Sequence, residues 1–540
     1  MARSRIAFAA ICATLALPGS SVADVPLYGT STIVGQVPGE KCCVSQVAVA
    51  DFNGDGRQDA IFTRSVYLGP DTFPVSVLLN DGHGRFVDAT SSIFDGSPPL
   101  TQNARELAIA DFNGDGRPDV FVADHGDDRN PFPGFQNTLI LSAPGGKLVD
   151  ATASVPPASD FTHSATAADV DGGGSADVYA GNIYGQSGTP PRVLVNDGTG
   201  VFSLGSGLLP AAQTNLDENR YTSSLFADVN GNGKVDLVLG GDGHSPSAVL
   251  LNDGTGHFTA LAGALPAKPF GPGAIALDVA ALDANHDPHM DLLMAFTKGD
   301  PFYVGRWIQV LVGNGDGTFD DETSMRLPQS DNADAWPVFF ELRDLNRDGR
   351  TDFGVRVNGG SSSPLFLADE AGAFHPGPVL NTGEHHLWTF VDALGDGSND
   401  ILAVDSYSGV VSLFPEHPVV TPPTDTSPPR LTVAVKRVHR LRRVIRNGLP
   451  LTVGCSEPCK FSARLVLRAR RGLAGARVVT VGRTSGRLAA AGRKNITVKL
   501  TRRARAAFRR KRKVTLSLRT TASDAAHNAA KTSRKIVLKR

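Results

Sequence analysis

The chain has 540 residues, and its 53 lysines and arginines nearly balance its 54 aspartates and glutamates, which leaves a formal net charge of −1. A chain of this length is expected to hold more than one domain. Beyond residue 23, no stretch is long and apolar enough to span a bilayer, which excludes a membrane-spanning protein.

Residues 1–23 have the pattern of a secretory signal peptide. Arg3 and Arg5 precede an apolar run at residues 6–17, and small residues up to Ala23 offer a cleavage site. The run is too short for a transmembrane helix, and Cys12 lies inside it. We therefore expect a secreted or extracellular protein, associated in some settings with the cell surface, where disulfides form and calcium is supplied.

An acidic nine-residue pattern, first present at residues 51–59 as Asp-Phe-Asn-Gly-Asp-Gly-Arg-Gln-Asp, recurs along most of the chain. Its copies lie 48 to 61 residues apart and begin at Asp51, Asp111, Asp169, Asp228, Asp283, Asp344 and Asp392. A fixed period of this size is typical of stacked or radial supersecondary units. In the second unit, four β-rich runs are separated by turn residues, at residues 106–110, 119–123, 137–142 and 147–152.

Seven such four-stranded units predict a β-propeller. In several units the third and fourth runs are joined by Asn-Asp-Gly-x-Gly-x-Phe, as at residues 80–86, which favours a tight hairpin. The seventh unit has only three runs, and we expect its missing strand to come from residues 25–34, which would close the ring. The predicted fold is therefore all-β, with a seven-bladed β-propeller over residues 24–418.

The repeated acidic loop offers the ligands that calcium prefers. Calcium takes six to eight hard oxygen ligands, and an EF-hand loop supplies them from alternate positions, with Gly at the sixth. The first loop has Asp51, Asn53 and Asp55 at positions one, three and five, Gly at six, and Asp59 at nine, where we expect a bidentate carboxylate. Position twelve, a bidentate Glu in an EF-hand, is Phe62. A hydrated turn is the alternative for any single copy, and the repetition argues against it.

The copies are unequal, and we expect about four to five Ca²⁺ sites. Gly173 stands at position five of the copy at Asp169, and Leu394 stands at position three of the copy at Asp392, so these two loops are expected to be weak or empty. The copy at Asp283 keeps its oxygens but has Pro288 at position six. The predicted metal-site residues occupy positions one, three, five, seven and nine of the five better copies: Asp51, Asn53, Asp55, Arg57, Asp59, Asp111, Asn113, Asp115, Arg117, Asp119, Asp228, Asn230, Asn232, Lys234, Asp236, Asp283, Asn285, Asp287, His289, Asp291, Asp344, Asn346, Asp348, Arg350 and Asp352.

These loops and hairpins resemble those of the FG-GAP or VCBS repeat family, whose best known members are the seven-bladed propellers of integrin α chains. The resemblance covers roughly residues 24–418. It implies the propeller fold and calcium loops. It implies no particular ligand, because the family hosts adhesion proteins and some enzymes.

Residues 419–430 form a linker rich in proline and threonine, beyond which the composition changes. Residues 421–540 hold 32 Lys plus Arg against three acidic residues, a net charge of +29, and the remaining 21 and 51 give residues 1–420 a net charge of −30. β-rich runs predict a small basic β-sandwich at residues 431–540, with a short helical crossover at residues 501–513. It resembles the Ig-like modules at the C-termini of secreted bacterial proteins. Such a charge attracts polyanions such as a wall polymer, an acidic glycan or DNA, and a solvated basic face is the alternative.

Four cysteines follow the signal peptide. Cys455 and Cys459 are predicted to form a disulfide, because no second pair of metal ligands is visible. Cys42 and Cys43 are adjacent, and a strained bridge, a free pair and an intermolecular link all stay open for them.

The loops at the end of the propeller opposite the calcium loops are the predicted binding face for a glycan or protein ligand. These loops join the second strand to the third, and one unit to the next. They carry rings and hydrogen-bonding groups that suit sugars or peptides: Tyr67, Phe73, Phe132, Phe135, Tyr184, Tyr303 and Trp336, with His125, Asp127, Asp128 and His244. Ordinary loop packing is the alternative.

We therefore expect a secreted calcium-binding propeller that acts in adhesion or ligand recognition. The chain has no HExxH motif, nucleophile elbow or phosphate-binding glycine loop, which argues against an enzyme. The alternative is a polysaccharide-acting lyase or hydrolase, which needs an acid and a base clustered over the central pore. His385 and His386 are weak catalytic candidates, and a spacer role in a wall or matrix is a third reading.

Overall fold

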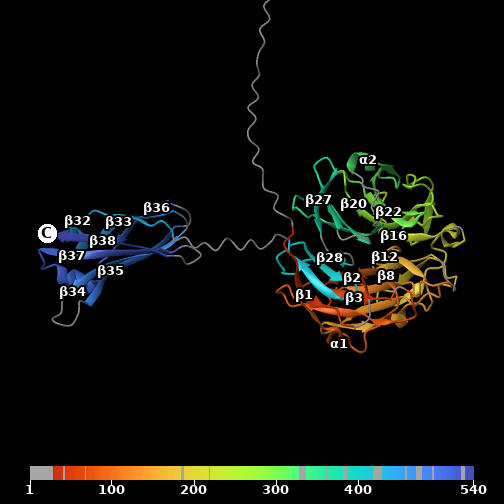
Figure 1. Cartoon of the computed structure of the whole chain (residues 1–540), viewed down its shortest axis with the longest axis horizontal. Coiled ribbons are helices and arrows are strands. Elements are labelled where there is room, and N and C mark those ends of the chain that lie inside the picture. The colour runs from red at the N-terminus through yellow and green to blue at the C-terminus, as the bar shows by residue number, and fades with distance from the viewer. Residues whose placement is uncertain are drawn as a thin grey trace, which may run out of the picture. The chain divides into compact units, whose positions relative to one another are not determined.

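The computed structural model divides into two compact units, Met1–Val419 and Val420–Arg540, which we describe separately (Figure 1). It describes residues 28–39, 43–66, 68–183, 188–217, 219–327, 336–358, 363–380, 386–416, 429–456, 459–469, 477–488, 492–523 and 529–540. The predicted signal peptide, most of the linker, Cys42, Tyr67, Tyr184 and His385 lie outside these ranges. Within them, no helix is long and apolar enough to cross a membrane.

The first unit consists of four-stranded antiparallel sheets, which we call blades one to seven in chain order. Blade one has β2 (Val44–Ala50), β3 (Asp59–Arg64), β5 (Ser76–Asn80) and β6 (Phe86–Asp88). Blade two has β8 (Ala104–Ala110), β9 (Asp119–Asp124), β10 (Thr138–Ala143) and β11 (Lys147–Asp150). Blade three has β12 (Thr162–Ala168), β13 (Asp177–Asn182), β14 (Arg192–Asn196) and β15 (Phe202–Leu204). Blade four has β16 (Tyr221–Ala227), β17 (Asp236–Gly241), β18 (Ala248–Asn252) and β19 (Phe258–Leu261).

The later blades are built in the same way. Blade five has β20 (Ile275–Leu282), β21 (Asp291–Gly299), β22 (Phe302–Gly313) and β23 (Phe319–Asp321). Blade six has β24 (Trp336–Arg343), β25 (Asp352–Asn358), β26 (Ser363–Ala368) and β27 (Phe374–Leu380). Blade seven has β28 (His386–Val391), β29 (Asp400–Asp405), β30 (Val410–Phe414) and, from the start of the chain, β1 (Thr32–Gln36). The connections hold short elements: β4 (Phe73–Pro74), α1 (Thr90–Ile93), β7 (Leu100–Thr101), η1 (Thr152–Ser154), η2 (Ala211–Thr214) and α2 (Thr323–Arg326).

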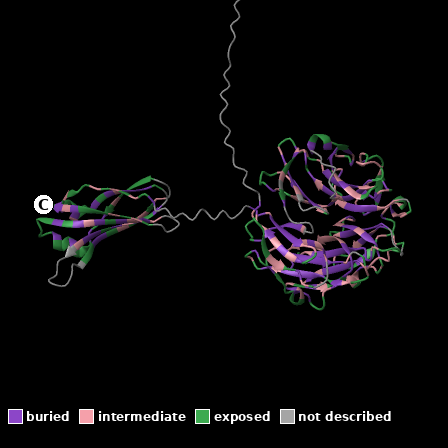
Figure 2. Cartoon of the chain, in the orientation of Figure 1, coloured by how far each residue is buried: buried purple, intermediate pink, exposed green. Residues whose placement is uncertain are grey.

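The blades form a closed ring. The first strand of each blade contacts the first strands of both neighbouring blades, from β2 round to β28 and back to β2. A cluster of buried apolar side chains lies between each pair of neighbouring blades. The second strands β3, β9, β13 and β17 are buried along their whole length, because neighbouring blades cover both faces (Figure 2). The all-β class and the propeller architecture predicted from the sequence are confirmed.

The ring closes by pairing the two ends of the unit. Strand β1 is antiparallel to β30, with Thr32 opposite Leu413 and Gln36 opposite Val410. The predicted origin of the fourth strand is thus confirmed, but the strand is Thr32–Gln36 and overlaps only the end of the expected range, residues 25–34. Gly35 explains this position, because a Cβ there would lie 2.5 Å from the carbonyl oxygen of Phe86 in blade one, so the close contact requires glycine.

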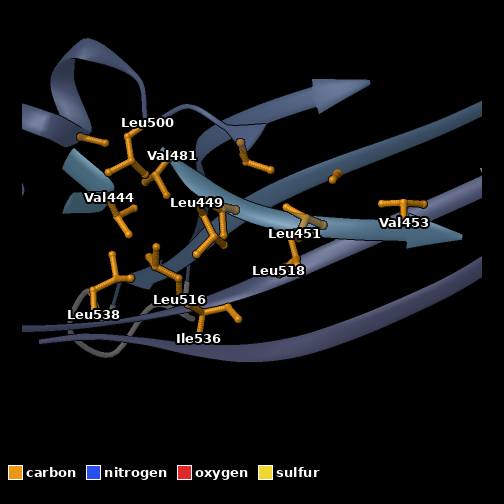
Figure 3. Close-up of a cluster of buried hydrophobic side chains, with 14 of the residues drawn as sticks. Val444, Leu449, Leu451, Val453, Val481, Leu500, Leu516, Leu518, Ile536 and Leu538 are labelled. Atoms are coloured by element: carbon orange, nitrogen blue, oxygen red, sulfur yellow. The ribbon is translucent and has the colours of Figure 1, made fainter. Parts of the chain in front are cut away.

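The second unit has two sheets that share one hydrophobic core. One sheet contains β31 (Thr432–Ala434), β33 (Leu449–Cys455) and β36 (Gly492–Val498). The other contains β32 (Val438–Arg440), β38 (Ala529–Lys539), β37 (Lys513–Ser523), β34 (Cys459–Ala469) and β35 (Arg477–Leu488). Two short helices are present, α3 (Leu441–Asn447) and α4 (Arg502–Phe508). Figure 3 shows side chains of β33, such as Leu451, beside those of β37 and β38, such as Leu516 and Ile536.

This unit agrees with the sequence in part. The expected crossover helix is α4, whereas α3 and β32 were not expected. Cys455 and Cys459 form the predicted disulfide. Cys43 is also disulfide-bonded, which excludes a free pair. An Ig-like topology stays a prediction.

Candidate functional site

The acidic loops join the first and second strands of their blades and fold over their own backbone. In blade one, Asp51 accepts hydrogen bonds from the backbone N–H groups of Gly54, Asp55 and Gly56, at 2.8, 3.0 and 2.7 Å. Asn53 Oδ1 accepts from the N–H of Asp55 at 2.9 Å. Asp111, the first residue of the acidic loop in blade two, accepts the same three bonds at 2.8, 3.1 and 2.8 Å. The oxygens of positions one and three are therefore drawn together over one turn.

The aspartate at position nine is a buried link between the loop and the third strand. In every blade it is at most 1% exposed. Its Oδ1 accepts the N–H of a residue within two positions of the end of the third strand, at 2.6 to 2.9 Å. The pairs are Asp59–Asn80, Asp119–Ser142, Asp177–Asn196, Asp236–Asn252, Asp291–Gly313, Asp352–Ala368 and Asp400–Glu416. In blades two to seven Oδ2 accepts the N–H of position two of the loop. The residue expected to close a calcium site thus also fixes the loop to the sheet.

Burial changes the acidity of this aspartate. Loss of solvent raises the pKa of Asp59 to about 7, and the negative charges of Asp55 and Asp51 add to the rise. Loss of solvent also raises the pKa of Asp177 and that of Asp236 to about 6. A nearby cation favours the charged carboxylate and opposes this cost. Asp59 Oδ2, in addition, is buried and has no hydrogen-bond partner.

The asparagine that opens each Asn-Asp-Gly hairpin joins neighbouring blades. Asn196 Nδ2 donates to the carbonyl oxygen of Phe112, in the loop of the preceding blade, at 2.8 Å. Asn252 donates to Val170 at 2.7 Å in the same way, and Asn80 donates to Ala393 across the ring closure at 3.0 Å. From the sequence, this asparagine was expected only to form a turn. Its repetition beside each acidic loop was the available signal.

The first strands of six blades carry a β-bulge near their N-terminal ends. The strand register shifts between Val44 and Gln46, Ala104 and Glu106, Thr162 and Ser164, Tyr221 and Ser223, Ala276 and Asp278, and Pro337 and Phe340. A bulge redirects side chains, and bulges are frequent beside functional sites. Residues at these bulges line a cavity of about 310 Å³, among them Arg105, Glu106, His163, Thr222 and Asp278.

A second cavity of about 890 Å³ is continuous with the first. Arg105, His163, Thr222, Trp336 and Asn358 line both. We call the two cavities together the central funnel, and the larger one its mouth.

Two groups of aromatic side chains line the mouth. Phe161 stacks on His125 with ring centres 4.5 Å apart, and it meets the ring of Phe132 edge-on at 5.3 Å. From blades five and six, Tyr303 stacks on Phe302 at 4.1 Å and meets Trp336 at 4.8 Å. Phe302 is 69% exposed. The mouth therefore presents two aromatic clusters.

The deeper cavity holds ionisable groups that depart from their usual behaviour. His163 donates from Nδ1 to the carbonyl oxygen of Thr222 at 3.0 Å, and Arg105 donates to its Nε2 at 3.2 Å, which assigns a neutral ring. Burial, aided by the charge of Arg105, lowers the pKa of His163 to about 3. Burial also raises the pKa of Glu106 to about 8, with a further contribution from the charge of Asp278, and raises that of Asp278 itself to about 7.

Each of these carboxyl groups is held by the following blade. Glu106 Oε2 accepts the N–H of Ala165 at 2.9 Å, and Asp278 Oδ2 accepts the N–H of Phe340 at 2.7 Å. Arg105, Glu106 and Asp278 were not predicted as site residues, because they lie within runs of strand residues. Their charge in the middle of an inner strand was the only signal.

The structure brings part of the predicted binding face together, and its binding role stays a prediction. Phe132, Tyr303 and Trp336 line the mouth of the funnel, as do His125, Asp128 and His244. Three predicted residues within the described ranges do not line the funnel. Phe73 is buried in strand β4, which pairs with β7, and Asp127 is paired with Arg129. Phe135 forms a bridge with Asp160.

Comparison with known families identifies the repeated unit. The model of the FG-GAP-like repeat matches residues 51–122, 111–180 and 228–294, and each match starts at the first aspartate of an acidic loop. The chain carries FG-GAP-like repeats. No curated protein matches its sequence.

Solved structures resemble the chain only distantly. The periplasmic gluconolactonase PpgL of Pseudomonas aeruginosa is 12% identical with a TM-score of 0.38, and the match covers 68% of this chain and 87% of that one. The V. cholerae biofilm matrix protein Bap1 is 11% identical with a TM-score of 0.33, over 94% and 70%. The extracellular region of plexin A4 is 8% identical with a TM-score of 0.37, over 93% and 68%. At these scores the similarities carry no argument about function.

The FG-GAP-like repeats offer oxygen ligands that fit calcium. Positions one, three, five and nine supply carboxylate or amide oxygens, which is the donor set of a hard cation. In the first, second and sixth loops, the arginine at position seven contacts the aspartate at position five: Arg57 with Asp55, Arg117 with Asp115, and Arg350 with Asp348. A cation would compete with these guanidinium groups, so the arginine side chains are not ligands.

The acidic loop at Asp169, in blade three, holds a group of three carboxylates. Oxygens of Asp169, Asp171 and Asp177 lie within 4.8 Å of one another, and this is the one such acidic group in the described parts of the chain. This loop was expected to be a weak or empty calcium site, because Gly173 has no side-chain oxygen at position five. Asp171 stands at position three, where five of the other loops have asparagine, and supplies a carboxylate that those loops lack there.

Proposed function

We propose that this is an extracellular recognition protein whose calcium-stabilised propeller binds a glycan in the central funnel. The observation that carries the proposal is the aromatic surface formed by Phe302, Tyr303 and Trp336 at the mouth. Aromatic faces give a sugar ring a large contact area at a small entropic cost. A mouth of about 890 Å³ lies within the usual range for ligand pockets.

The polar groups of the mouth support a glycan over an apolar ligand. Arg220 and Asn358 offer donors, and Asp242 and His244 offer acceptors or donors, beside the rings. A polyhydroxyl ligand uses both kinds of group, whereas an apolar ligand would leave them unpaired at a cost. The calcium loops lie at the other end of the blades, so the metal is expected to stiffen the propeller without contacting the glycan.

A glycan array screened in calcium and in EDTA tests the proposal. Tyr303→Ala and Trp336→Ala are each expected to weaken binding to the best glycan by roughly 30-fold, the loss typical of a central aromatic contact. Val201→Ala is the matched control, because Val201 is 47% exposed but lies in a hairpin at the calcium end. Binding that survives both ring deletions would show that the funnel mouth is not the site.

The deeper cavity favours a second candidate function, cleavage of the bound glycan. A raised pKa keeps Glu106 protonated near neutral pH, as a general acid requires, and Asp278 in the same cavity is the candidate base. Incubation with the bound glycan, followed by assay for new reducing ends or unsaturated products, separates the two functions. An enzyme loses product formation in Glu106→Gln while keeping glycan binding; a recognition protein forms no product at all.

A further inference from the structure

The second unit contains a groove lined by arginine. It lies between helices α3 and α4, which contact each other, and has a volume of about 820 Å³. Its charged lining comes from both helices and from the last strand: Arg442, Arg446, Arg502, Arg505, Arg509 and Arg540. Leu441 and Phe508, both buried in the core, form its base and hold the helices in place.

The groove has no acidic counter-charge among the described residues. Asp425, Glu457 and Asp524 are the acidic residues of the unit, and all three lie outside the described ranges. Helical spacing places Arg442 beside Arg446, and Arg505 beside Arg509, at i and i+4. Like charges at this spacing destabilise a helix. No acidic side chain in the described part of the unit offsets this repulsion, and an external anion would.

We propose that this groove binds the anionic groups of an acidic polysaccharide chain. The guanidinium group pairs with carboxylate or sulfate through two parallel hydrogen bonds, which favours arginine for this purpose. Phe508 is the one aromatic residue that lines the groove, and it is only 4% exposed, so the groove offers no ring to stack on the bases of a single-stranded nucleic acid.

The chain offers matched controls for three of the groove arginines, on the same helices or next to the end of α4. Arg443, Arg503 and Arg510 are exposed and do not line the groove. The triple variant Arg446→Gln, Arg505→Gln, Arg509→Gln removes three charges from the groove. The triple variant Arg443→Gln, Arg503→Gln, Arg510→Gln removes three charges from outside it. Both change the net charge equally.

The test measures binding of the full-length protein to polygalacturonate, heparin and duplex DNA between about 50 and 200 mM salt. Three lost ion pairs at an exposed site correspond to roughly a tenfold loss of affinity. We expect the groove variant to lose about tenfold on polygalacturonate or heparin and to show a shallower salt dependence. The control variant is expected to stay within about twofold. The two polymers distinguish carboxylate from sulfate as the preferred group.

Several results would overturn the proposal. Equal losses in both triple variants would mean that only bulk charge matters. Absence of polysaccharide binding at low salt, or binding to DNA alone, would also overturn it. Thermal melting checks that the variants fold, and if the groove triple does not fold, Arg505→Gln against Arg503→Gln makes the same comparison with one charge.

Discussion

At the scale of single residues, the position-nine aspartates combine two roles that sequence reasoning treats as one. Asp119 accepts backbone N–H groups from Ser142, Phe112 and Asn113, at 2.6, 2.7 and 3.1 Å. It is therefore part of the fold whether or not a cation is bound. The exposed loop residues, by contrast, make most of their hydrogen bonds within their own turn.

This difference predicts distinct effects of two substitutions in the second loop. Asp119→Ala leaves buried N–H groups without acceptors and is expected to destabilise the propeller by about 2 to 4 kcal/mol, in EDTA as well as in calcium. Asp115→Asn keeps a hydrogen-bonding side chain and is expected to lose only its share of the calcium gain, about 0.4 to 1.4 kcal/mol at about 1 mM calcium. Chemical denaturation with and without calcium measures both. An Asp119→Ala protein of normal stability in EDTA would contradict the structural role.

The carboxyl groups of the funnel predict a pH dependence of stability. The pKa of Glu106 rises from its usual 4.5 to about 8, and that of Asp278 rises to about 7, because both are buried. Between about pH 5 and 8 each of these two groups keeps its proton to a higher pH in the folded chain than in the unfolded chain, so their contribution to stability falls as the pH rises. Glu106→Gln removes one of the two groups and is expected to flatten this fall. Melting temperatures in EDTA across this pH range give the test, with the exposed Asp217→Asn as control; equal slopes in the Glu106→Gln and wild-type proteins would refute it.

At the scale of elements, regular strands were predictable and irregular ones were not. The runs expected in the second repeat match β8 to β11 of blade two within two residues, because alternation and the acidic loops bound each strand. The bulges that build the funnel were not predictable, since Arg105, His163 and Thr222 share no residue type that marks an extra residue. The partner of the hairpin asparagine lies in another blade, and only the three-dimensional ring reveals it.

Strand β1 gives an element-scale prediction about ring closure. A side chain at Gly35 would meet the backbone of Phe86 in blade one, and backbone cannot move aside as a flexible side chain can. Gly35→Val is therefore expected to destabilise the propeller by about 1 to 3 kcal/mol, the usual cost of overpacking. Ile33→Ala is the control, because Ile33 on the same strand is 76% exposed and a change there is expected to stay within about 0.5 kcal/mol. Equal denaturation midpoints for Gly35→Val and wild type would place the closing strand elsewhere.

At the scale of the whole molecule, calcium is expected to act on one unit only. Four to five sites together contribute about 2 to 7 kcal/mol at about 1 mM calcium, which corresponds to a rise of roughly 2 to 9 °C in the melting temperature of a unit of this size. The second unit has no acidic residue in its described part and is expected to melt at the same temperature in calcium and in EDTA. Calorimetry should therefore show two transitions, of which calcium moves one. A single transition, or two that move together, would show that the units do not unfold independently.

The pairing of β1 with β30 also sets the order in which the propeller is assembled. The two strands lie about 380 residues apart in the chain, with Thr32 opposite Leu413, whereas every other blade is made of neighbouring segments. Local hairpins form as their residues become available, but this last pairing has to wait until the chain is complete through residue 414. Joining ends so far apart costs about 3 kcal/mol more than closing a ten-residue hairpin. Until it happens, β30 has a free edge, the kind of strand on which unfinished chains pair with one another. The ring closure that protects the finished molecule is therefore also the step at which a newly made chain is most exposed to aggregation.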